Sequence, residues 1–550
     1  MSKRRREQEH FTLPFSKRLR ESAGIPIDRL SSLSNELLLH ILSFLPISSL
    51  SVCQRLSRRF HALSGDSELW KRQYYTQWVR PRARRLASVR RSTLPTRTEY
   101  SPKVSTWLDH GHLAEEGKVT NWKGQYRLRH NWSRGTCRFR EVELPPQPFP
   151  PVLAKLCGAF VFTADSTHGL RAWAAREPEI CLAKASFSGQ AGSSEMLPTA
   201  LAVSHSEDSQ EIVVGFENGH FHRYIMNTET SQLVLQSSDS SSSSGAITAM
   251  ALSSPYLLMV SQNKILSLHT LQTGPRGPET PGGAESSREL ASLKADNMVA
   301  PMTLCLRKST LDIVATVVYS FFHIGCGWSL GIQELRFDKT GRQLESRLTS
   351  TVDSQYGIRP LQGMLPSATR RISTTTGQIG DGGATVPTTA AILHKQPPTS
   401  MSYSHPYLLT SHADNTLTMY LVVSNSDSLF VRGGQRLWGH TSSVSTVQVK
   451  NRGKAVSVSS RGNEVRVWEL ETAVPSLGTR RPLREESSIQ INPENKRENC
   501  RTEAGDLDAS SDNSREMSCG RECIGFDEER VFLLRERTIG TQLLECYDFT

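Results

Sequence analysis

Several features are missing from this 550-residue sequence, and each absence excludes a class of protein. No apolar run approaches the roughly 20 residues that a membrane-spanning helix needs. The polar and basic beginning, MSKRRREQEH, is unlike a secretory signal peptide. The ten cysteines are scattered, with no Cys-x-x-Cys pair and no paired Cys/His framework. We therefore expect reduced thiols in the nucleus, the cytoplasm or both, no membrane contact and no bound metal.

Enzyme motifs are missing as well. The sequence contains no GxxxxGK[ST] phosphate loop, no HExxH helix, no GxSxG turn and no kinase motif set. The 16 histidines are dispersed without metal-ligand spacing, and no cysteine stands in a nucleophile motif. The sequence thus predicts a non-catalytic protein without a cofactor, which acts by binding other molecules.

Positive charge is in excess, with a formal net charge of +11. Two basic clusters near the N-terminus are separated by ten residues, as in a bipartite nuclear localisation signal, and a solvated arm is an equally good interpretation. A second basic stretch, residues 71–91, could contact nucleic acid, but an acidic protein partner or solvent is favoured because no nucleic-acid-binding signature accompanies it. The two N-terminal clusters are Lys3, Arg4, Arg5 and Arg6, and Lys17, Arg18 and Arg20.

Residues 27–71 have the strongest helical pattern. Ser34 is a good N-cap, and Pro46 ends the first predicted helix because proline cannot continue it. We expect Ser48 or Ser49 to cap a second helix that ends near Gly65, and Ser67 to cap a third. Apolar residues recur three or four positions apart along the two longer helices. Three helices of about 45 residues are near the lower limit for a self-sufficient core, so a partner is expected to cover part of their apolar surface.

The order of residues in this region resembles the F-box. Ser34 stands where that family usually has a proline, which commonly lies at the partner contact. A helical hairpin that packs on the rest of its own chain is the alternative. The resemblance implies docking on a Skp-family linker, and some of the matching residues are expected to form internal core instead. The candidate Skp-binding residues are Leu33, Glu36, Leu37, Leu38, Ile41, Leu45, Pro46, Leu50, Cys53, Phe60, Leu69 and Trp70.

From residue 135 onward, short strand-like runs alternate with turn residues. Asn-Gly and similar pairs between apolar runs predict hairpins, and recurring hairpins are typical of repeat architectures. We count about seven units, and we expect a strand near 139–144 to pair with the last hairpin, near 542–549, and so close a ring without open edges. The hairpin turns are expected at Ser166–Gly169, Glu217–Gly219, Gln262–Asn263 and Asp414–Asn415.

One unit, residues 437–471, is close to the WD-repeat pattern, with Gly439-His440 at its start and Trp468 near its end. In that family a His, a hydroxyl, an Asp and the Trp form hydrogen bonds across the blade. The resemblance implies that Ser457 or Ser459 supplies the hydroxyl, but Gly462 occupies the Asp position, so we expect an incomplete network. The next best match ends at Trp173.

The predicted architecture is a small all-α F-box followed by an all-β propeller with about seven degenerate WD-repeat-like blades and disordered insertions. The insertions are polar and rich in Ser, Gly, Pro or charge. The expected segments are a disordered basic arm at 1–24, the F-box at 25–75, a basic linker with helical segments at 76–134, and the propeller at 135–550, with loops near 236–246, 273–298, 365–399 and 477–520.

An F-box followed by a propeller resembles the substrate-receptor subunits of SCF-type ubiquitin ligases. The resemblance implies that the F-box binds a Skp-family linker and, through it, a cullin–RING ligase, while the propeller holds a protein substrate, including a phosphorylated one. The substrate-binding residues stay unassigned. The alternative is a nuclear WD-repeat scaffold whose F-box binds Skp without ligase function, with nucleic-acid contacts through the basic linker.

Overall fold

The computed structural model describes residues 30, 32–80, 120–145, 152–187, 196–205, 209–228, 230–240, 245–271, 287–294, 299–308, 312–355, 392–425, 428–450, 453–460, 464–470, 488–493, 521–538 and 541–550. These residues form two compact units, one of residues 30–80 with 120–126 and the other of residues 127–550. The arm at 1–24 with its two basic clusters lies outside the described residues, as does most of the linker. Within the described part, no helix has the length and apolar character needed to cross a membrane.

The first unit is helical. Ser34 begins α1 as expected, because its hydroxyl accepts a hydrogen bond from the Leu37 backbone N–H at 3.5 Å. The core of this unit contains Leu42, Leu50 and Leu69, and the Trp70 indole N–H donates to the Ser64 carbonyl at 2.8 Å. The helices are α1 (Asn35–Leu42), α2 (Ile47–Cys53), α3 (Arg58–Ser64), α4 (Ser67–Tyr74), the π-helical turn η1 (Tyr75–Val79) and the first residues of α7 (Trp122–Arg134).

The predicted second helix is in fact two helices, α2 and α3. Ser57 interrupts it in an extended conformation, and its hydroxyl accepts from the Phe60 backbone N–H at 3.2 Å, which caps α3. Two predicted caps were also wrong. Pro46 rather than Ser48 or Ser49 precedes α2, and the Asp66 carboxylate rather than Ser67 caps α4, accepting from the Glu68 N–H at 2.9 Å.

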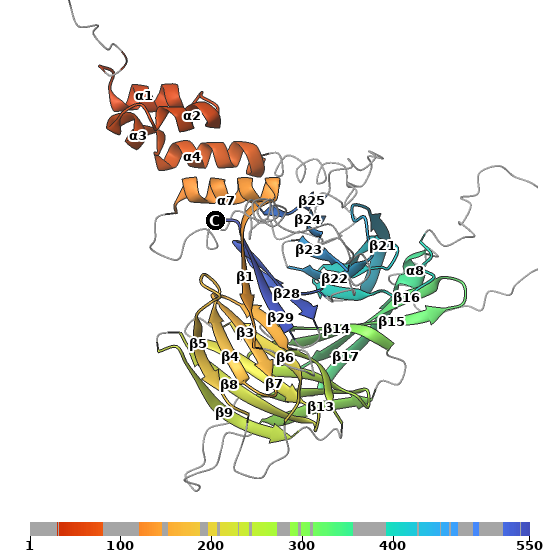
Figure 1. Ribbon diagram of the computed structural model, residues 1–550. Helices are drawn as coiled ribbons and strands as arrows, with labels where there is room; N and C mark the ends of the chain where they lie inside the picture. Colours follow the sequence, from red (N-terminus) through yellow and green to blue (C-terminus); the bar gives the residue numbers. More distant parts are fainter. Residues whose placement is uncertain are drawn as a thin grey trace, which may run out of the picture. The chain divides into compact units, whose positions relative to one another are not determined.

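The second unit is a seven-bladed β-propeller, which confirms the predicted fold class (Figure 1). Six blades are four-stranded antiparallel sheets in sequential order, and the seventh has the order β26-β1-β29-β28-β27. The first three blades are β2(Leu153–Cys157), β3(Phe160–Asp165), β4(Gly169–Ala174), β5(Cys181–Ala185); β6(Pro198–His205), β7(Ser209–Phe216), β8(His220–Asn227), β9(Gln232–Ser240); and β10(Ile247–Ser253), β11(Tyr256–Ser261), β12(Ile265–Thr270), β13(Arg288–Lys294). The next three are β14(Val299–Lys308), β15(Ile313–His323), β16(Gly327–Phe337), β17(Gln343–Ser350), followed by α8(Thr351–Gln355); β18(Ser400–Ser404), β19(Tyr407–Ser411), β20(Leu417–Ser424), β21(Leu429–Leu437); and β22(Val444–Val449), β23(Lys454–Ser459), β24(Val465–Glu469), β25(Ser488–Gln490). The seventh contains β1(Thr136–Glu143), β26(Asn492–Pro493), β27(Arg521–Phe526), β28(Arg530–Thr538) and β29(Thr541–Asp548).

The ring closes as the sequence predicted. Strand β1 pairs antiparallel with β29, in a register that runs from Arg138 opposite Asp548 to Glu143 opposite Leu543. In Figure 1, β1 in orange lies beside the blue strands of the last blade. The first strands of neighbouring blades contact one another around the whole circle, including β27 with β2. The four predicted hairpin turns also connect the second and third strands of their blades.

The prediction that four polar segments form loops is wrong at three places. Residues 237–240 belong to β9, residues 288–294 form β13, and residues 488–490 form β25. Each is the outermost strand of its blade, which is held by backbone hydrogen bonds along one edge and needs little apolar composition. Most of the other residues in these segments lie outside the described part of the chain.

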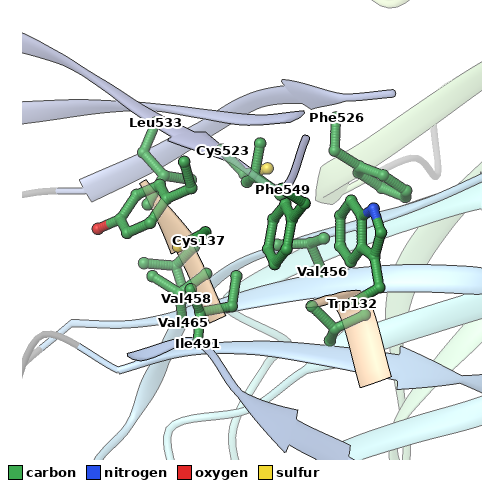
Figure 2. Close-up of a cluster of buried hydrophobic side chains, with 13 residues drawn as sticks. Trp132, Cys137, Val456, Val458, Val465, Ile491, Cys523, Phe526, Leu533 and Phe549 are labelled. Carbon is green, nitrogen blue, oxygen red and sulfur yellow. The ribbon is translucent and has the colours of Figure 1, made fainter. Parts of the chain in front are cut away.

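The second half of α7 packs on the last blade. Trp132 stacks on Phe549 with ring centroids 3.9 Å apart and planes at 11°, and its indole N–H donates to the Glu528 carbonyl at 2.7 Å. Figure 2 shows the two rings side by side in the buried cluster. The Lys454 ammonium lies 4.2 Å from the Trp132 ring centroid, and the Asn131 amide donates to the Phe549 carbonyl at 2.7 Å. The segment that leads into the propeller is therefore packed against the seventh blade, which closes the ring.

Candidate functional site

Helix α1 has one buried and one exposed apolar face. Leu38 and Leu42 are 1% and 2% exposed, because they face the core with Leu50 and Leu69. Leu37, Ile41 and Phe44 are 53%, 43% and 68% exposed. Leu37 and Ile41 are four residues apart on one face of α1. Phe44 lies in the turn after this helix, where its backbone N–H donates to the Ile41 carbonyl at 3.1 Å. We call these three residues the α1 stripe.

Polar groups fix the surroundings of the α1 stripe. The Arg72 guanidinium lies 5.8 Å from the Phe44 ring centroid and donates to the Ser43 hydroxyl at 3.0 Å. The Arg59 guanidinium donates to the Asn35 amide oxygen at 2.8 Å and to the Leu33 carbonyl at 2.6 Å. A cation and a braced helix start therefore border an exposed apolar row, which is an arrangement suited to a partner protein.

The structure separates the twelve candidate docking residues into three groups. Four are exposed, three are partly buried, and five are internal core that a partner cannot reach in the folded unit. The exposed ones are Glu36, Leu37, Ile41 and Pro46, the partly buried ones are Leu33, Leu45 and Cys53, and the buried ones are Leu38, Leu50, Phe60, Leu69 and Trp70.

Four further exposed apolar residues of the helical unit were not among the candidates, namely Leu30, Phe44, Val52 and Leu56. Phe44 follows Ile41 by three positions, so its helical spacing could have identified it. Val52 and Leu56 are 58% and 63% exposed on α2 and just after it. The predicted continuous helix placed Leu56 on the same line as the core residues, and the break before Ser57 turns it outward.

The aromatic residues of the basic stretch serve the packing of the helical unit. Trp78 and Tyr126 have ring centroids 4.6 Å apart, Tyr74 and Trp122 lie 5.6 Å apart, and Trp70 contacts Tyr126 at 5.4 Å. Rings engaged in this way are poor platforms for stacking on nucleic-acid bases.

The WD-type network of the sixth blade contains more partners than the sequence suggested. The Ser457 hydroxyl lies 2.6 Å from His440 Nε2 and accepts from the Trp468 indole N–H at 2.7 Å. Gly462 lies outside the described residues, but Glu464 adds a carboxylate to the network. This carboxylate lies 3.3 Å from His440 Nδ1 and accepts from the Thr441 N–H at 3.0 Å. Burial, helped by the charge of Arg466, lowers the pKa of His440 to about 4, so the ring is neutral at physiological pH.

The other predicted structural residues also lie in blade packing. Ser459 accepts from the Glu464 N–H at 3.1 Å rather than joining His440 and Trp468. A Cβ at Gly439 would lie only 2.8 Å from the Ser488 hydroxyl, so this position favours glycine. Trp173 repeats the indole contact in the first blade, where its N–H donates to the Thr163 hydroxyl at 2.9 Å. These residues hold the blades together and are not arranged around a substrate.

Reactive groups of the propeller are buried. Burial raises the pKa of the Cys523 and Cys546 thiols to about 12 and that of Cys157 to about 11, so they stay protonated at neutral pH. The Cys157 thiol donates to the Gln210 amide oxygen at 3.0 Å, and the Cys523 thiol donates to that of Gln448 at 3.4 Å. Among the residues that the structure describes, no group of three or more His, Cys, Asp or Glu side chains is arranged to hold a metal ion.

Comparison with known proteins identifies an F-box protein of the β-propeller class. Residues 30–76 match the F-box-like domain model, which confirms the resemblance seen in the sequence. Residues 137–550 match the model described as the F-box protein pof12 beta-propeller. Because that match covers more than half of the chain, the protein belongs to this family.

Two solved structures illustrate the similarity to other proteins. The computationally designed Ika8 protein is 12% identical, with a TM-score of 0.32, over 76% of this chain and 99% of that one. The RRP9 WD40 repeats are 10% identical, with a TM-score of 0.36, over 74% of this chain and 97% of that one. No curated protein matches the chain.

Proposed function

We propose that this protein is the substrate-receptor subunit of an SCF-type E3 ubiquitin ligase, with no catalytic activity of its own. The α1 stripe carries the proposal, because it is an exposed apolar row inside the F-box-like region. A Skp-family linker would cover it. Fully burying a side chain such as Leu, Ile or Phe contributes about 1.5–3 kcal/mol, so three such residues can provide the central part of an interface.

The ligase would act through proximity. The F-box attaches the chain to a Skp-family linker, and through it to a cullin and a RING subunit, while the propeller holds the protein to be ubiquitinated. Holding a target lysine near the ubiquitin thioester raises its effective concentration, without any reacting group from this chain.

Co-purification tests this function. Tagged full-length protein should bring down both a Skp-family linker and a cullin, and the Leu37→Asp/Ile41→Asp variant should lose both while keeping a folded propeller. The pair Leu344→Asp/Leu348→Asp is a matched control, because it changes exposed aliphatic residues on β17 of the propeller. Recovery of Skp without cullin would favour a scaffold over a ligase receptor, and recovery of neither would refute the proposal.

We also propose that the protein works in the nucleus, the cytoplasm or both. Replacing Lys3, Arg4, Arg5 and Arg6 by alanine should shift a fluorescent fusion toward the cytoplasm if the basic clusters act as a nuclear signal. An unchanged distribution would show that they do not.

A further inference from the structure

The hairpin of β15 and β16 extends beyond its own blade. Both strands have 11 residues, and they pair from Ile313 opposite Phe337 to His323 opposite Gly327. The pairing of β14 with β15 ends at Ser320, and that of β17 with β16 ends at Gly331. Residues 321–329 therefore continue as a two-stranded tip beyond β14 and β17, and they meet only the segment around His394 among the described strands and bridges. We call these residues the finger; its hairpin is drawn in green in Figure 1.

The finger presents apolar side chains to solvent. Phe322 is 62% exposed and Ile324, at the turn, is 97% exposed. The Phe322 and Trp328 rings meet edge to face at 5.9 Å. His323 Nδ1 lies 3.2 Å from the backbone nitrogens of Gly325 and of Cys326, which closes the turn. Because the turn is held from within, Ile324 is kept in place outside the blade rather than folded back on it.

The segment around His394 supports the finger next to its turn. The Trp328 backbone N–H donates to the His394 carbonyl at 2.9 Å, and Gly327 forms a parallel bridge with His394. The neighbouring Leu393 is 50% exposed, and a Cβ placed on Gly327 would lie 3.2 Å from its methyl group. Leu393 thus adds to the apolar surface next to the turn of the finger.

The same face of the propeller carries an exposed tryptophan. In antiparallel blades, the turn between the second and third strands lies on the same side as the connection from the fourth strand to the next blade. The finger is such a turn, and Trp438 lies in the connection after β21, 65% exposed, with the Arg436 guanidinium 5.7 Å from its ring centroid. The His394 ring stacks on the His412 ring at 3.8 Å, and the His412 backbone carbonyl accepts from the Val444 N–H, so direct contacts join these loops across three blades.

The charges on this face indicate the kind of partner. Residues 320–330 and 392–395 contain no Asp or Glu, and Lys395 is exposed. Arg436 stands beside Trp438, and the neighbouring Asp414 carboxylate lies 3.7 Å from the Arg436 guanidinium. We name Phe322, Ile324, Leu393 and Trp438, with Lys395 and Arg436 at their border, the finger patch.

We propose that the finger patch binds an extended acidic segment of a partner protein that carries apolar anchor residues. Exposed Trp and Phe beside Arg are the residue types that dominate protein interfaces. Lys395 supplies an exposed cation at the border, and Arg436 shares its charge with Asp414, so acidic residues in the partner complement the Lys395 side of the patch. The proposal deepens the proposed function and rests on it in one respect, namely that the partner is a substrate of the ligase.

A peptide array tests the proposal with the full-length chain. The probes are peptides of equal length with two apolar anchors, flanked by Asp and Glu in one set, by Lys and Arg in a second, and by Ser and Gly in a third. The acidic set should bind best, and Phe322→Ser/Ile324→Ser should weaken its binding at least about tenfold. Leu348→Ser is the matched control, since Leu348 is 67% exposed on β17 of the same blade, and it should bind as the wild type does.

A charge reversal gives a second, independent readout. Lys395→Glu alters an exposed side chain, and it should reduce the preference for the acidic set over the basic one. Equal binding of the acidic and basic sets by the wild type, or equal binding by the finger variant and the control, would overturn the proposal. The proposal would also be overturned if the finger variant lost self-association or liposome binding but kept its binding to the acidic peptides.

The two proposals can fail separately. The finger variant should retain Skp binding in a pull-down, because its substitutions lie in the propeller. If the wild type bound no Skp but showed the acidic preference, the proposed function would fail while the finger patch would stand. If the wild type bound Skp but showed no preference for the acidic peptides, the finger-patch proposal would fail while the proposed function would stand.

Discussion

The helical unit and the propeller differ in the share of their large apolar side chains that is exposed to solvent. Within the described residues, six of the 16 exposed large apolar side chains lie in the much smaller helical unit, and three of them form the α1 stripe. The propeller buries most of the apolar side chains of its second and third strands, and it pairs its first and last segments through β1 and β29. A closed ring stabilises itself, whereas a small helical unit with an exposed apolar row is built to be completed by a partner.

Opening the ring gives the largest expected effect. A chain that ends before Val531 lacks β28 and β29, so β1 and β27 lose their partners and strand edges are exposed. We expect the propeller to unfold, losing the whole of a domain stability that is typically about 5–15 kcal/mol. Circular dichroism and limited proteolysis measure this. A soluble, protease-resistant product would show that the closure contributes little.

Within the closed ring, removal of a single hydroxyl group should lower the stability by a smaller amount. Ser457→Ala leaves the Trp468 indole N–H, and His440 Nε2, without their partner in a buried network. Each unsatisfied buried group costs about 1–3 kcal/mol, so the unfolding free energy should fall by that order. Chemical denaturation followed by tryptophan fluorescence would detect it. A denaturation midpoint of the Ser457→Ala variant equal to that of the wild type would mean that a water molecule replaces the hydroxyl group.

The sequence predicted the propeller and the helical unit to different extents. The alternation in 136–143 and in the last hairpin predicted the closure, because ladder pairing depends on a local period of two. The outermost strands β13 and β25 were missed, since they are polar and are held mainly by their backbones. Glu464 was missed because a carboxylate two residues beyond the usual Asp position can still reach His440.

In the helical unit, periodicity identified the apolar residues but not their division between core and surface. Leu37 and Leu38 are neighbours of the same type, yet one is exposed and the other buried. That division depends on where α4 places Leu69 and Trp70 against α1 and α2, which is tertiary information. The break at Ser57 likewise depends on a cap that competes with a continuous helix.

Acid should weaken the propeller through its buried histidines. Burial lowers the pKa of His394 and His440 to about 4 and that of His412 to about 3, against 6.5 for the free side chain. The unfolded chain therefore takes up protons that the folded chain does not, and stability falls as the pH drops below 6.5 toward the folded values. At about pH 5.5 each histidine should cost on the order of 1.4 kcal/mol.

Thermal unfolding at about pH 7.5 and about pH 5.5 checks the sign and the size of this effect. His394→Gln/His412→Gln should show a shallower loss of Tm on acidification than the wild type, whatever its absolute stability. A wild-type Tm that rose on acidification would contradict the assignment of neutral, buried rings.

The smallest effect is expected in the polar insertion between β26 and β27 of the seventh blade. Replacing residues 495–516 with a short Gly/Ser linker keeps β25 and β26 and should change the unfolding free energy by about 1 kcal/mol or less, because loop closure depends only weakly on length. Replacing residues 479–516 removes both strands and should cost clearly more. Equal melting temperatures for the two deletions would show that the outermost strand contributes nothing to the blade.

The central claim is that the α1 stripe, and not the propeller surface, is completed by a Skp-family linker. Titration calorimetry of the full-length protein with purified Skp measures this directly. Leu37→Asp/Ile41→Asp should weaken binding by about a hundredfold or more, since it places charges in an apolar interface. Leu344→Asp/Leu348→Asp should bind with wild-type affinity, and both variants should keep the wild-type circular dichroism. Undiminished binding by the Leu37→Asp/Ile41→Asp variant would contradict the account.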